Sequence, residues 1–204
     1  MKSLQHAFLV LIVLTVLTGL IYPAIVTAIA VVCFPAQAHG SLTYNKGHVT
    51  GSRLIGQNFA GRGYFWSRPS ATNYSAMPSG GSNLSPLSDT LRAQVDARRD
   101  AFRLANGLTA RDTIPRDMLF ASGSGLDPDI SPQSARLQIG RVARERGFTN
   151  DQKMALTSLV ERSIVPRQLG FLGSERVNVV QLNQDVERMS GFAGMERKHT
   201  ASGN

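Results

Sequence analysis

The first 45 residues of the chain contain one charged side chain, Lys2, and residues 7–34 form an almost unbroken apolar block. As an α-helix this block would be about 42 Å long, which exceeds the roughly 30 Å hydrocarbon core of a bilayer. The sequence therefore predicts one transmembrane helix at residues 7–34, preceded by a short tail at residues 1–6.

A cleaved signal peptide is the alternative, because Lys2 gives a basic start and residues 36–38 read Ala-Gln-Ala, a small-x-small pattern. Signal cores span about 7 to 15 residues, and this block is about twice that length, so a retained anchor is favoured. Lipid attachment at Cys33 is disfavoured, since two valines precede it. We interpret Cys33 as a plain apolar thiol.

Charge distribution around the block predicts its orientation. Lys2 and the amino terminus are the only positive charges before it, and residues 35–45 after it carry none. We therefore expect a cytoplasmic N-terminus and an extracytoplasmic remainder. A single cysteine permits no internal disulfide, so the outer part must fold by its hydrophobic core.

Low-bulk residues within the block recur every four positions, and two alanines add further positions of close approach. Such a pattern favours packing against a second helix, although a helix that faces only lipid remains the alternative. Pro23 also predicts a kink, because its ring crowds the preceding turn. The predicted helix-packing residues are Thr15, Gly19, Pro23, Ala24, Thr27 and Ala28.

The rest of the chain is long enough for one domain, and it carries nearly all of the formal net charge of +8. We expect an extracytoplasmic α+β domain at residues 35–188 and a polar, loose C-terminal tail at residues 189–204. Nucleic acid is excluded as a partner by the outer location and by basic residues scattered singly. Anionic lipid headgroups, an acidic protein surface or a simple solvated face remain.

Glycine-broken alternation predicts short strands at residues 42–48 and 49–55, and a last strand at residues 176–182. Residues 68–84 are rich in Ser, Gly, Asn and Pro, which indicates a loop. The domain should thus contain a small sheet.

Three helices are predicted from their end signals. The first has Ser85 as N-cap before Pro86 and stops at Gly107, with Leu87 on its apolar face. The second starts in the same way at Ser131 and Pro132 and ends at Gly147. In the third, Thr149 and Gln152 form a capping box, and Pro166 closes the pattern.

Two glycine-rich loops resemble phosphate cradles, and one lies just before a predicted helix. Neither is followed by a lysine. We therefore favour a structural interpretation, in which glycine allows positive φ and close backbone approach. Paired Asp127 and Asp129 could alternatively hold a cation. The candidate loop residues are Ser79, Gly80, Gly81, Ser82, Asn83, Gly123, Ser124, Gly125 and Asp127.

Short motifs in a fixed order make the chain recognisable. The motifs are Leu54-Ile55-Gly56-Gln57, Tyr64-Phe65, Arg68-Pro69-Ser70-Ala71, Ser79-Gly80-Gly81-Ser82-Asn83-Leu84, Ala121-Ser122-Gly123-Ser124-Gly125-Leu126-Asp127-Pro128, Arg141-Val142-Ala143 and Leu169-Gly170-Phe171-Leu172-Gly173. With them, the chain resembles the C subunit of the Kdp-type potassium-transporting ATPase over roughly residues 8–182.

The resemblance implies an accessory, single-span subunit in a bacterial inner membrane. Its partners would be a channel-like potassium-binding subunit, a P-type catalytic subunit, a very small fourth subunit and membrane lipid. ATP and potassium would be bound at the level of the complex, with no cofactor bound by this chain. The resemblance also implies a catalytic chaperone that raises the ATP affinity of the catalytic subunit. No Asp-Lys-Thr-Gly-Thr loop and no Walker-type glycine loop occur in the chain, so no catalytic residue is expected.

Aromatic, arginine and leucine residues within these motifs suggest how the head could hold a partner. We expect it to clamp external loops of the channel-like subunit. The predicted partner-binding residues are Tyr64, Phe65, Arg68, Phe171 and Leu172.

A membrane-tethered hydrolase and a solute-binding module are the alternative functions. The histidines are His6, His39, His48 and His199, so none lies between residues 64 and 182 to activate a nucleophile. With one cysteine and no paired histidine motif, no metal site is expected.

Overall fold

The computed structural model describes residues 2–45 and 47–201, with side chains described for these residues except Asn45 and those beyond residue 190. Contacts between residues divide the chain into two compact units, Met1–Ser52 and Arg53–Asn204. We refer to the second unit as the head.

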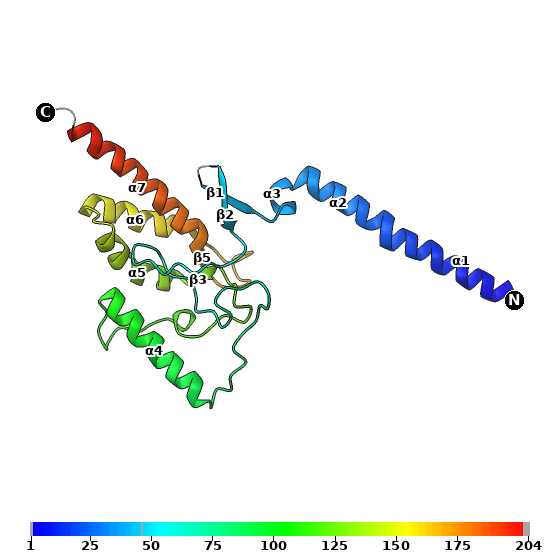
Figure 1. Cartoon of the computed structure of the whole chain (residues 1–204), viewed down its shortest axis with the longest axis horizontal. Helices are drawn as coiled ribbons and strands as arrows, with labels where there is room; N and C mark the ends of the chain where they lie inside the picture. The colour runs from blue at the N-terminus through cyan, green and yellow to red at the C-terminus, as the bar shows by residue number, and fades with distance from the viewer. Residues whose placement is uncertain (1, 46, 202–204) are drawn as a thin grey trace. The chain divides into compact units, whose positions relative to one another are not determined.

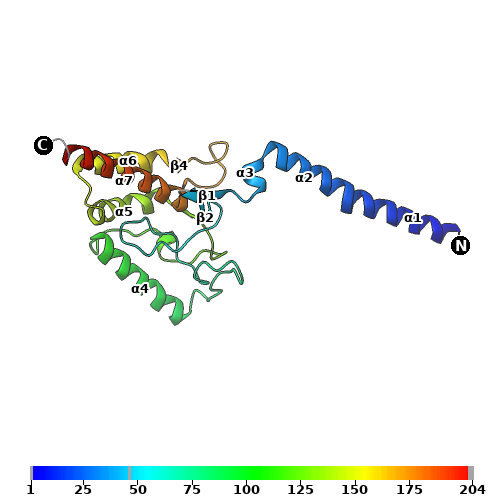
Figure 2. The same cartoon turned by 45° about the horizontal axis from the view of Figure 1, so that its top comes forward.

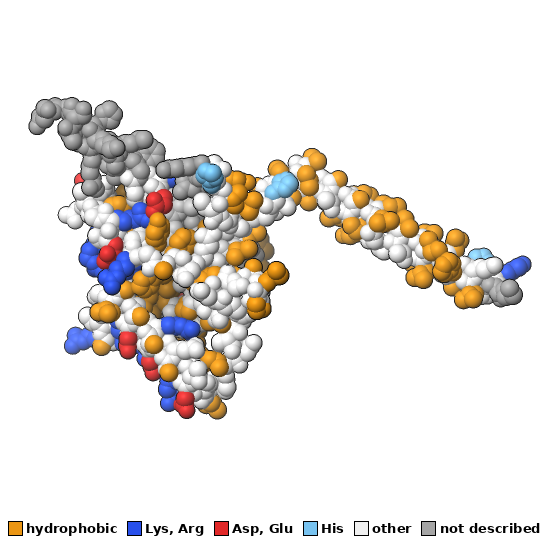
Figure 3. All heavy atoms as spheres, viewed as in Figure 1, with side chains coloured by type: hydrophobic (Ala, Val, Ile, Leu, Met, Phe, Trp, Pro, Cys, Tyr) orange, Lys and Arg blue, Asp and Glu red, His pale blue; other side chains and the backbone are white. Residues whose placement is uncertain are grey.

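The first unit begins with the apolar helix (Figure 1). Lys2–Cys33 is one helical stretch of 32 residues, long and apolar enough to cross a membrane, and no side chain in its most apolar window is buried by the rest of the chain. Figure 3 shows hydrophobic side chains along its length. A short hairpin with a bulge between Thr43 and Tyr44 ends the unit. In order, its elements are α1 (Lys2–Val16), the π-helical turn η1 (Leu17–Ile21), α2 (Tyr22–Cys33), α3 (Pro35–Ala38), β1 (Leu42–Asn45) and β2 (His48–Ser52).

Within its described residues, 53–201, the head combines four α-helices with a small antiparallel sheet in the strand order β3-β5-β4. Helix α5 packs on α6, and α6 on α7, as Figures 1 and 2 show from two directions. Its elements are α4 (Asp89–Asn106), the 3-10 turn η2 (Arg116–Met118), β3 (Asp129–Ile130), α5 (Pro132–Glu145), α6 (Asn150–Arg162), β4 (Ile164–Val165), β5 (Arg176–Asn178) and α7 (Val179–Ala201).

Local capping signals explain where several helices begin and end. Ser131 caps α5 with Pro132 at the first position, and Thr149 and Gln152 form the predicted capping box of α6. Helix α4 ends at Gly107, whose φ of 65° is left-handed. These predictions are confirmed.

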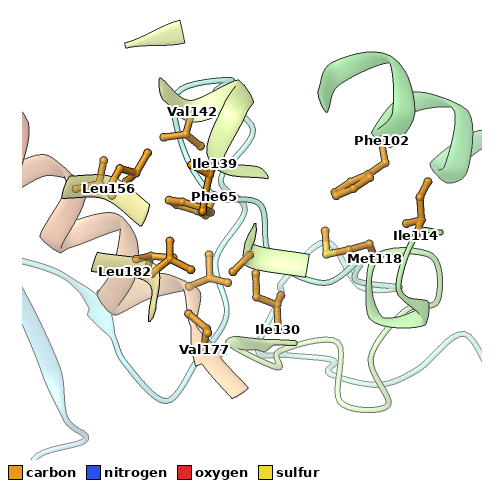
Figure 4. Close-up of a cluster of buried hydrophobic side chains, with 14 of the residues drawn as sticks. Phe65, Phe102, Ile114, Met118, Ile130, Ile139, Val142, Leu156, Val177 and Leu182 are labelled. Atoms are coloured by element: carbon orange, nitrogen blue, oxygen red, sulfur yellow. The ribbon is translucent and has the colours of Figure 1, made fainter. Parts of the chain in front are cut away.

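The core of the head lies where α5, α6 and α7 meet β3 and β5, with a second part under α4 (Figure 4). Helix α5 supplies its inward face to this cluster. Burial of such side chains is the main stabilising term of the fold. The fully covered hydrophobic residues include Phe65, Ala135, Val142, Leu156, Val160, Val177, Val179, Leu182 and Val186.

Three secondary-structure predictions were wrong. Helix α4 begins at Asp89 with Ser88 as its cap, so Ser85 and Pro86 lie before it and Leu87 is 90% exposed. The last strand stops at Asn178, because the Asn178 side chain accepts a hydrogen bond from the Gln181 backbone N–H at 3.0 Å and starts α7. Residues 189–201 of the tail are helical instead of loose, since α7 continues to Ala201, and residues 202–204 lie outside the described part of the chain.

Candidate interaction surfaces

The apolar helix carries all six predicted packing residues on exposed positions. A Cβ added at Gly19 would meet no atom within 4 Å. In a regular α-helix, residues four apart drift by about 40° around the axis. The π-helical turn Leu17–Ile21, closed by a bond from the Tyr22 N–H to the Leu17 carbonyl, has more residues per turn and counters that drift. It therefore helps to keep Thr15 and Thr27 on one face.

The π-helical turn ends at Ile21, two residues before Pro23. Proline has no backbone N–H to donate and its ring crowds the preceding turn, so a local departure from α-helical geometry is expected there. The predicted disturbance of the helix at Pro23 thus takes the form of a π-helical turn.

The backbone of residues 62–66 is held by polar side chains of the helices around it, in the manner of a sheet neighbour. Asn183 donates to the Phe65 carbonyl at 2.9 Å and accepts from the Phe65 N–H at 2.8 Å. Gln138 accepts from the Trp66 N–H at 2.7 Å. Both side-chain amides are buried. They provide hydrogen-bond partners for backbone groups of Phe65 and Trp66, which would be costly to bury without one.

Arg141 is the largest fully buried side chain of the head. Its guanidinium donates to the Tyr64 carbonyl at 2.9 Å, to the Arg62 carbonyl and to Asn106 Oδ1 at 3.0 Å. It also lies over the Trp66 ring, 4.1 Å from the centroid. Burial lowers the pKa of Arg141 to about 10, which is still well above neutral pH, so the side chain remains a cation there.

Arg146 also holds the backbone of residues 62–66, near its start. Its Nε donates to the Gly63 carbonyl and its Nη2 donates to Glu187, each at 2.6 Å. Its guanidinium carbon lies over the Tyr64 ring, 4.9 Å from the centroid. A hydrogen bond to Glu187, together with burial, raises the pKa of the Tyr64 hydroxyl. Tyr64 is therefore half-buried within the head.

The two candidate glycine-rich loops lie against each other. A Cβ on Gly81 would be 3.2 Å from the Gly123 carbonyl oxygen, and one on Gly125 would be 2.6 Å from Thr72 Oγ1 and 2.8 Å from the Gly80 carbonyl oxygen. Gly125 also has a φ of 70°. The chain's own atoms thus occupy the space beside Gly81 and Gly125, which favours the structural interpretation of these loops. The remaining candidates Ser79, Ser82, Asn83, Gly123 and Ser124 are exposed.

Two ion pairs flank the second glycine loop. Arg68 bonds to Asp127 at 2.7 Å, and Arg176 lies 3.2 Å from Asp129. Burial, with the charge of Asp127, raises the pKa of Asp129. The described side chains contain no group of three His, Cys, Asp or Glu placed to hold a metal ion, and each of these two carboxylates faces an arginine.

The five predicted partner-binding residues fall into different environments. Phe65 is 0% exposed, so its side chain cannot contact a partner, and that assignment is corrected. Tyr64 contacts Arg146, and Arg68 is paired with Asp127, which leaves each only partly accessible. Phe171 and Leu172 are exposed.

Sequence reasoning missed Gln138, Arg141 and Asn183. The available signal was their position: Gln138 and Arg141 lie among the inward-facing apolar residues of α5, and Asn183 directly follows buried Leu182 on α7. A polar side chain on a buried helix face requires a partner.

These observations define the class: a compact α+β head joined to a single N-terminal apolar helix. The family described as K+-transporting ATPase, c chain (KdpC), matches residues 4–188. The chain is 47% identical over 193 residues to the Potassium-transporting ATPase KdpC subunit of Gemmatimonas aurantiaca, covering 93% of this chain and 94% of the relative. It is 49% identical over 193 residues to that of Geobacter sulfurreducens, covering 93% and 99%. The chain belongs to the KdpC family, which confirms the resemblance found in its motifs.

Proposed function

We propose that this chain is an accessory, non-catalytic subunit that stabilises an ATP-driven potassium import complex. Its helix docks along the channel-like subunit, and the same complex holds the P-type catalytic subunit and the small fourth subunit. Family membership supports the complex, because the relatives are named as subunits of a potassium-transporting ATPase.

The observation that carries this proposal is the exposed face of the apolar helix. Its small residues are uncovered by the described part of the chain, and Gly19 has open space where a Cβ would stand. A helix that met only lipid would gain nothing from aligned small residues, whereas a neighbouring helix can approach closely there. The proposed topology is a single pass in the inner membrane, with a cytoplasmic N-terminus and an extracytoplasmic head.

The proposed effect on ATP affinity acts through contact with the catalytic subunit. Support for this route comes from the glycine loops, where Gly81 and Gly125 pack against atoms of the head itself. ATP and potassium are then bound by the other subunits, and this chain raises the affinity of the catalytic subunit for ATP.

Co-purification of the complex tests the docking. A tagged chain carrying Gly19→Leu or Ala24→Leu should recover less of the multi-span subunits than the unaltered chain, because added bulk separates the helices. Leu17→Phe is the matched control for Gly19→Leu, since it adds bulk about half a turn away from Gly19 and should leave recovery unchanged. A complex that stays assembled and active with Gly19→Leu would show that this face does not dock.

A further inference from the structure

A short apolar hairpin projects between β4 and β5. Gln168 and Leu172 bond to each other's backbone, N–H to carbonyl, at 3.0 and 2.9 Å, and Leu169 and Gly170 adopt left-handed φ angles of 53° and 82°. The turn between them exposes three large apolar side chains: Leu169 at 84%, Phe171 at 72% and Leu172 at 54%. The backbone bonds hold this tip in one shape, so little order has to be gained on binding.

Two arginines stand at the base of the hairpin. Arg167 precedes it directly and Arg162 ends α6 just before β4, and both are exposed. Neither has a carboxylate within ion-pair distance among the residues that the structure describes. Glu175, which is also exposed, lies at the other end of the same connection, so the two arginines exceed the nearby carboxylates by one charge. The hairpin thus combines an apolar tip with a surplus of positive charge at its base, the arrangement of a segment that lies in a lipid interface.

We propose that the tip of this hairpin enters the interface of an anionic phospholipid bilayer and holds the head against the membrane. The proposal rests on the membrane placement of the apolar helix given under the proposed function. That helix keeps a lipid surface close to the head at all times, so a contact too weak to form from solution persists through the tether. Phe171 and the two leucines enter the apolar part, while Arg167 and Arg162 face the phosphates.

The size of the tip favours lipid over a protein partner. A stable protein interface buries about 800 Å² on each side, which three side chains on one turn do not supply. Insertion into lipid has no such threshold, because each apolar side chain contributes separately. Contact between Phe171 or Leu172 and a partner subunit, as the sequence analysis predicts, is the competing outcome.

Site-directed fluorescence on the full chain tests the proposal. A single environment-sensitive label is placed at Phe171→Cys in a Cys33→Ser background, and the chain is reconstituted in phosphatidylcholine vesicles with or without phosphatidylglycerol. Lipids with a spin label high on the acyl chain act as quenchers. Leu104→Cys on α4, also highly exposed, is the matched control within the head. Labelled native Cys33, which lies at the end of the apolar helix, reports whether that helix is in the bilayer.

We expect the label at position 171 to shift to the blue and to be quenched by the spin-labelled lipid, more strongly with phosphatidylglycerol, while the label at 104 is unaffected. Adding Arg167→Gln should remove most of the phosphatidylglycerol dependence. If Cys33 is quenched and position 171 is not, the lipid contact is wrong although the anchor stands. Shielding of position 171 only when the other subunits are present would assign the hairpin to a protein partner and overturn the proposal. An unquenched Cys33 would instead refute the membrane placement itself.

Discussion

Asn183 binds both backbone groups of Phe65, donating to its carbonyl at 2.9 Å and accepting from its N–H at 2.8 Å across 118 positions of sequence. One side chain thereby fixes the most buried aromatic residue of the head. Since Phe65 has no exposed surface, water cannot replace these bonds, and the pairing ties the backbone of residues 62–66 to α7.

Asn183→Leu should destabilise the head strongly. The substitution leaves the N–H and the carbonyl of Phe65 buried without partners, at about 1–3 kcal/mol for each group. Chemical unfolding of the full chain in detergent, followed by the fluorescence of the single tryptophan, Trp66, measures the loss. Gln181→Leu on the exposed side of α7 is the control, with a change within about 0.5 kcal/mol. Equal effects of the two variants would contradict the pairing as a source of stability.

Arg141→Lys should also destabilise the head, although charge is kept. A lysine ammonium cannot reproduce the planar fork that reaches Asn106 and the carbonyls of residues 62 and 64. Each acceptor left unsatisfied costs about 1–3 kcal/mol. The emission of Trp66 should change as well, because the guanidinium leaves its ring face. Arg144→Lys, an exposed position on the same helix, should alter neither the unfolding curve nor the emission.

Gly125 and Gly140 predict opposite responses to alanine. At Gly125 a Cβ would lie 2.6 Å from Thr72 Oγ1, and the φ of 70° is unfavourable for alanine, so Gly125→Ala should lower the free energy of unfolding by about 1–3 kcal/mol. Gly140 lies within α5, and a Cβ added there would meet no atom within 4 Å. Gly140→Ala should therefore raise that free energy by about 0.5–1 kcal/mol. Thermal or chemical unfolding of both variants measures these changes. A Gly125→Ala chain as stable as the unaltered chain would refute the close packing of the two loops.

Features set by neighbouring residues were predicted well, and features set by distant ones were not. The capping box of Thr149 and Gln152 depends on four residues and is confirmed. The strand predicted at residues 176–182 is present at residues 176–178 but was predicted too long. Valines favour strands, whereas Asn178 caps a helix through the Gln181 N–H. The helix-capping signal of Asn178 was visible in the sequence beside the strand preference of the valines. The burial of Val179 and Val180 within α7 decided in favour of the helix.

In the candidate interaction surfaces, too, features set by neighbouring residues were predicted and features set by distant residues were not. The apolar helix and its small residues follow from composition and spacing alone. Nothing in the spacing of Phe65 shows that it is buried, because Asn183 and the core that cover it lie more than a hundred residues away. For the same reason an aromatic motif that looked like a contact surface divides into a buried Phe65 and a half-buried Tyr64.

The cap of α4 distinguishes two serines three residues apart. The Ser88 hydroxyl accepts from the Leu91 N–H at 3.4 Å at the helix start, whereas the Ser85 hydroxyl accepts from the Leu87 N–H at 3.2 Å in the preceding turn. Ser88→Ala should lower the free energy of unfolding by about 1 kcal/mol. Ser85→Ala should have a smaller effect, because no helix begins there. Unfolding curves of the two variants would show the reverse order if α4 began at Pro86.

Asp129 predicts a stability that depends on pH. Burial and the charge of Asp127 raise the pKa of its carboxyl above the ordinary 3.8, with Arg176 only partly compensating. Between 3.8 and that raised value the folded chain holds more protons than the unfolded chain, so this group's contribution to stability falls as pH rises. Asp129→Asn removes the titration. The variant should be more stable than the unaltered chain at neutral pH, and the difference should shrink as pH falls through the raised pKa.

Glu187 predicts a pH dependence of stability opposite to that of Asp129, and it serves as the control for that prediction. Burial alone would raise the pKa of its carboxyl, but hydrogen bonds from Arg146 and Tyr64 outweigh burial and hold the pKa below the ordinary 4.5. Its contribution is therefore present above pH 4.5 and is lost as pH falls through the lowered folded value. Glu187→Gln should be less stable than the unaltered chain at neutral pH, with the gap closing in acid. Because both variants approach the unaltered chain at low pH from opposite sides, parallel pH profiles for the three proteins would contradict the assigned shifts.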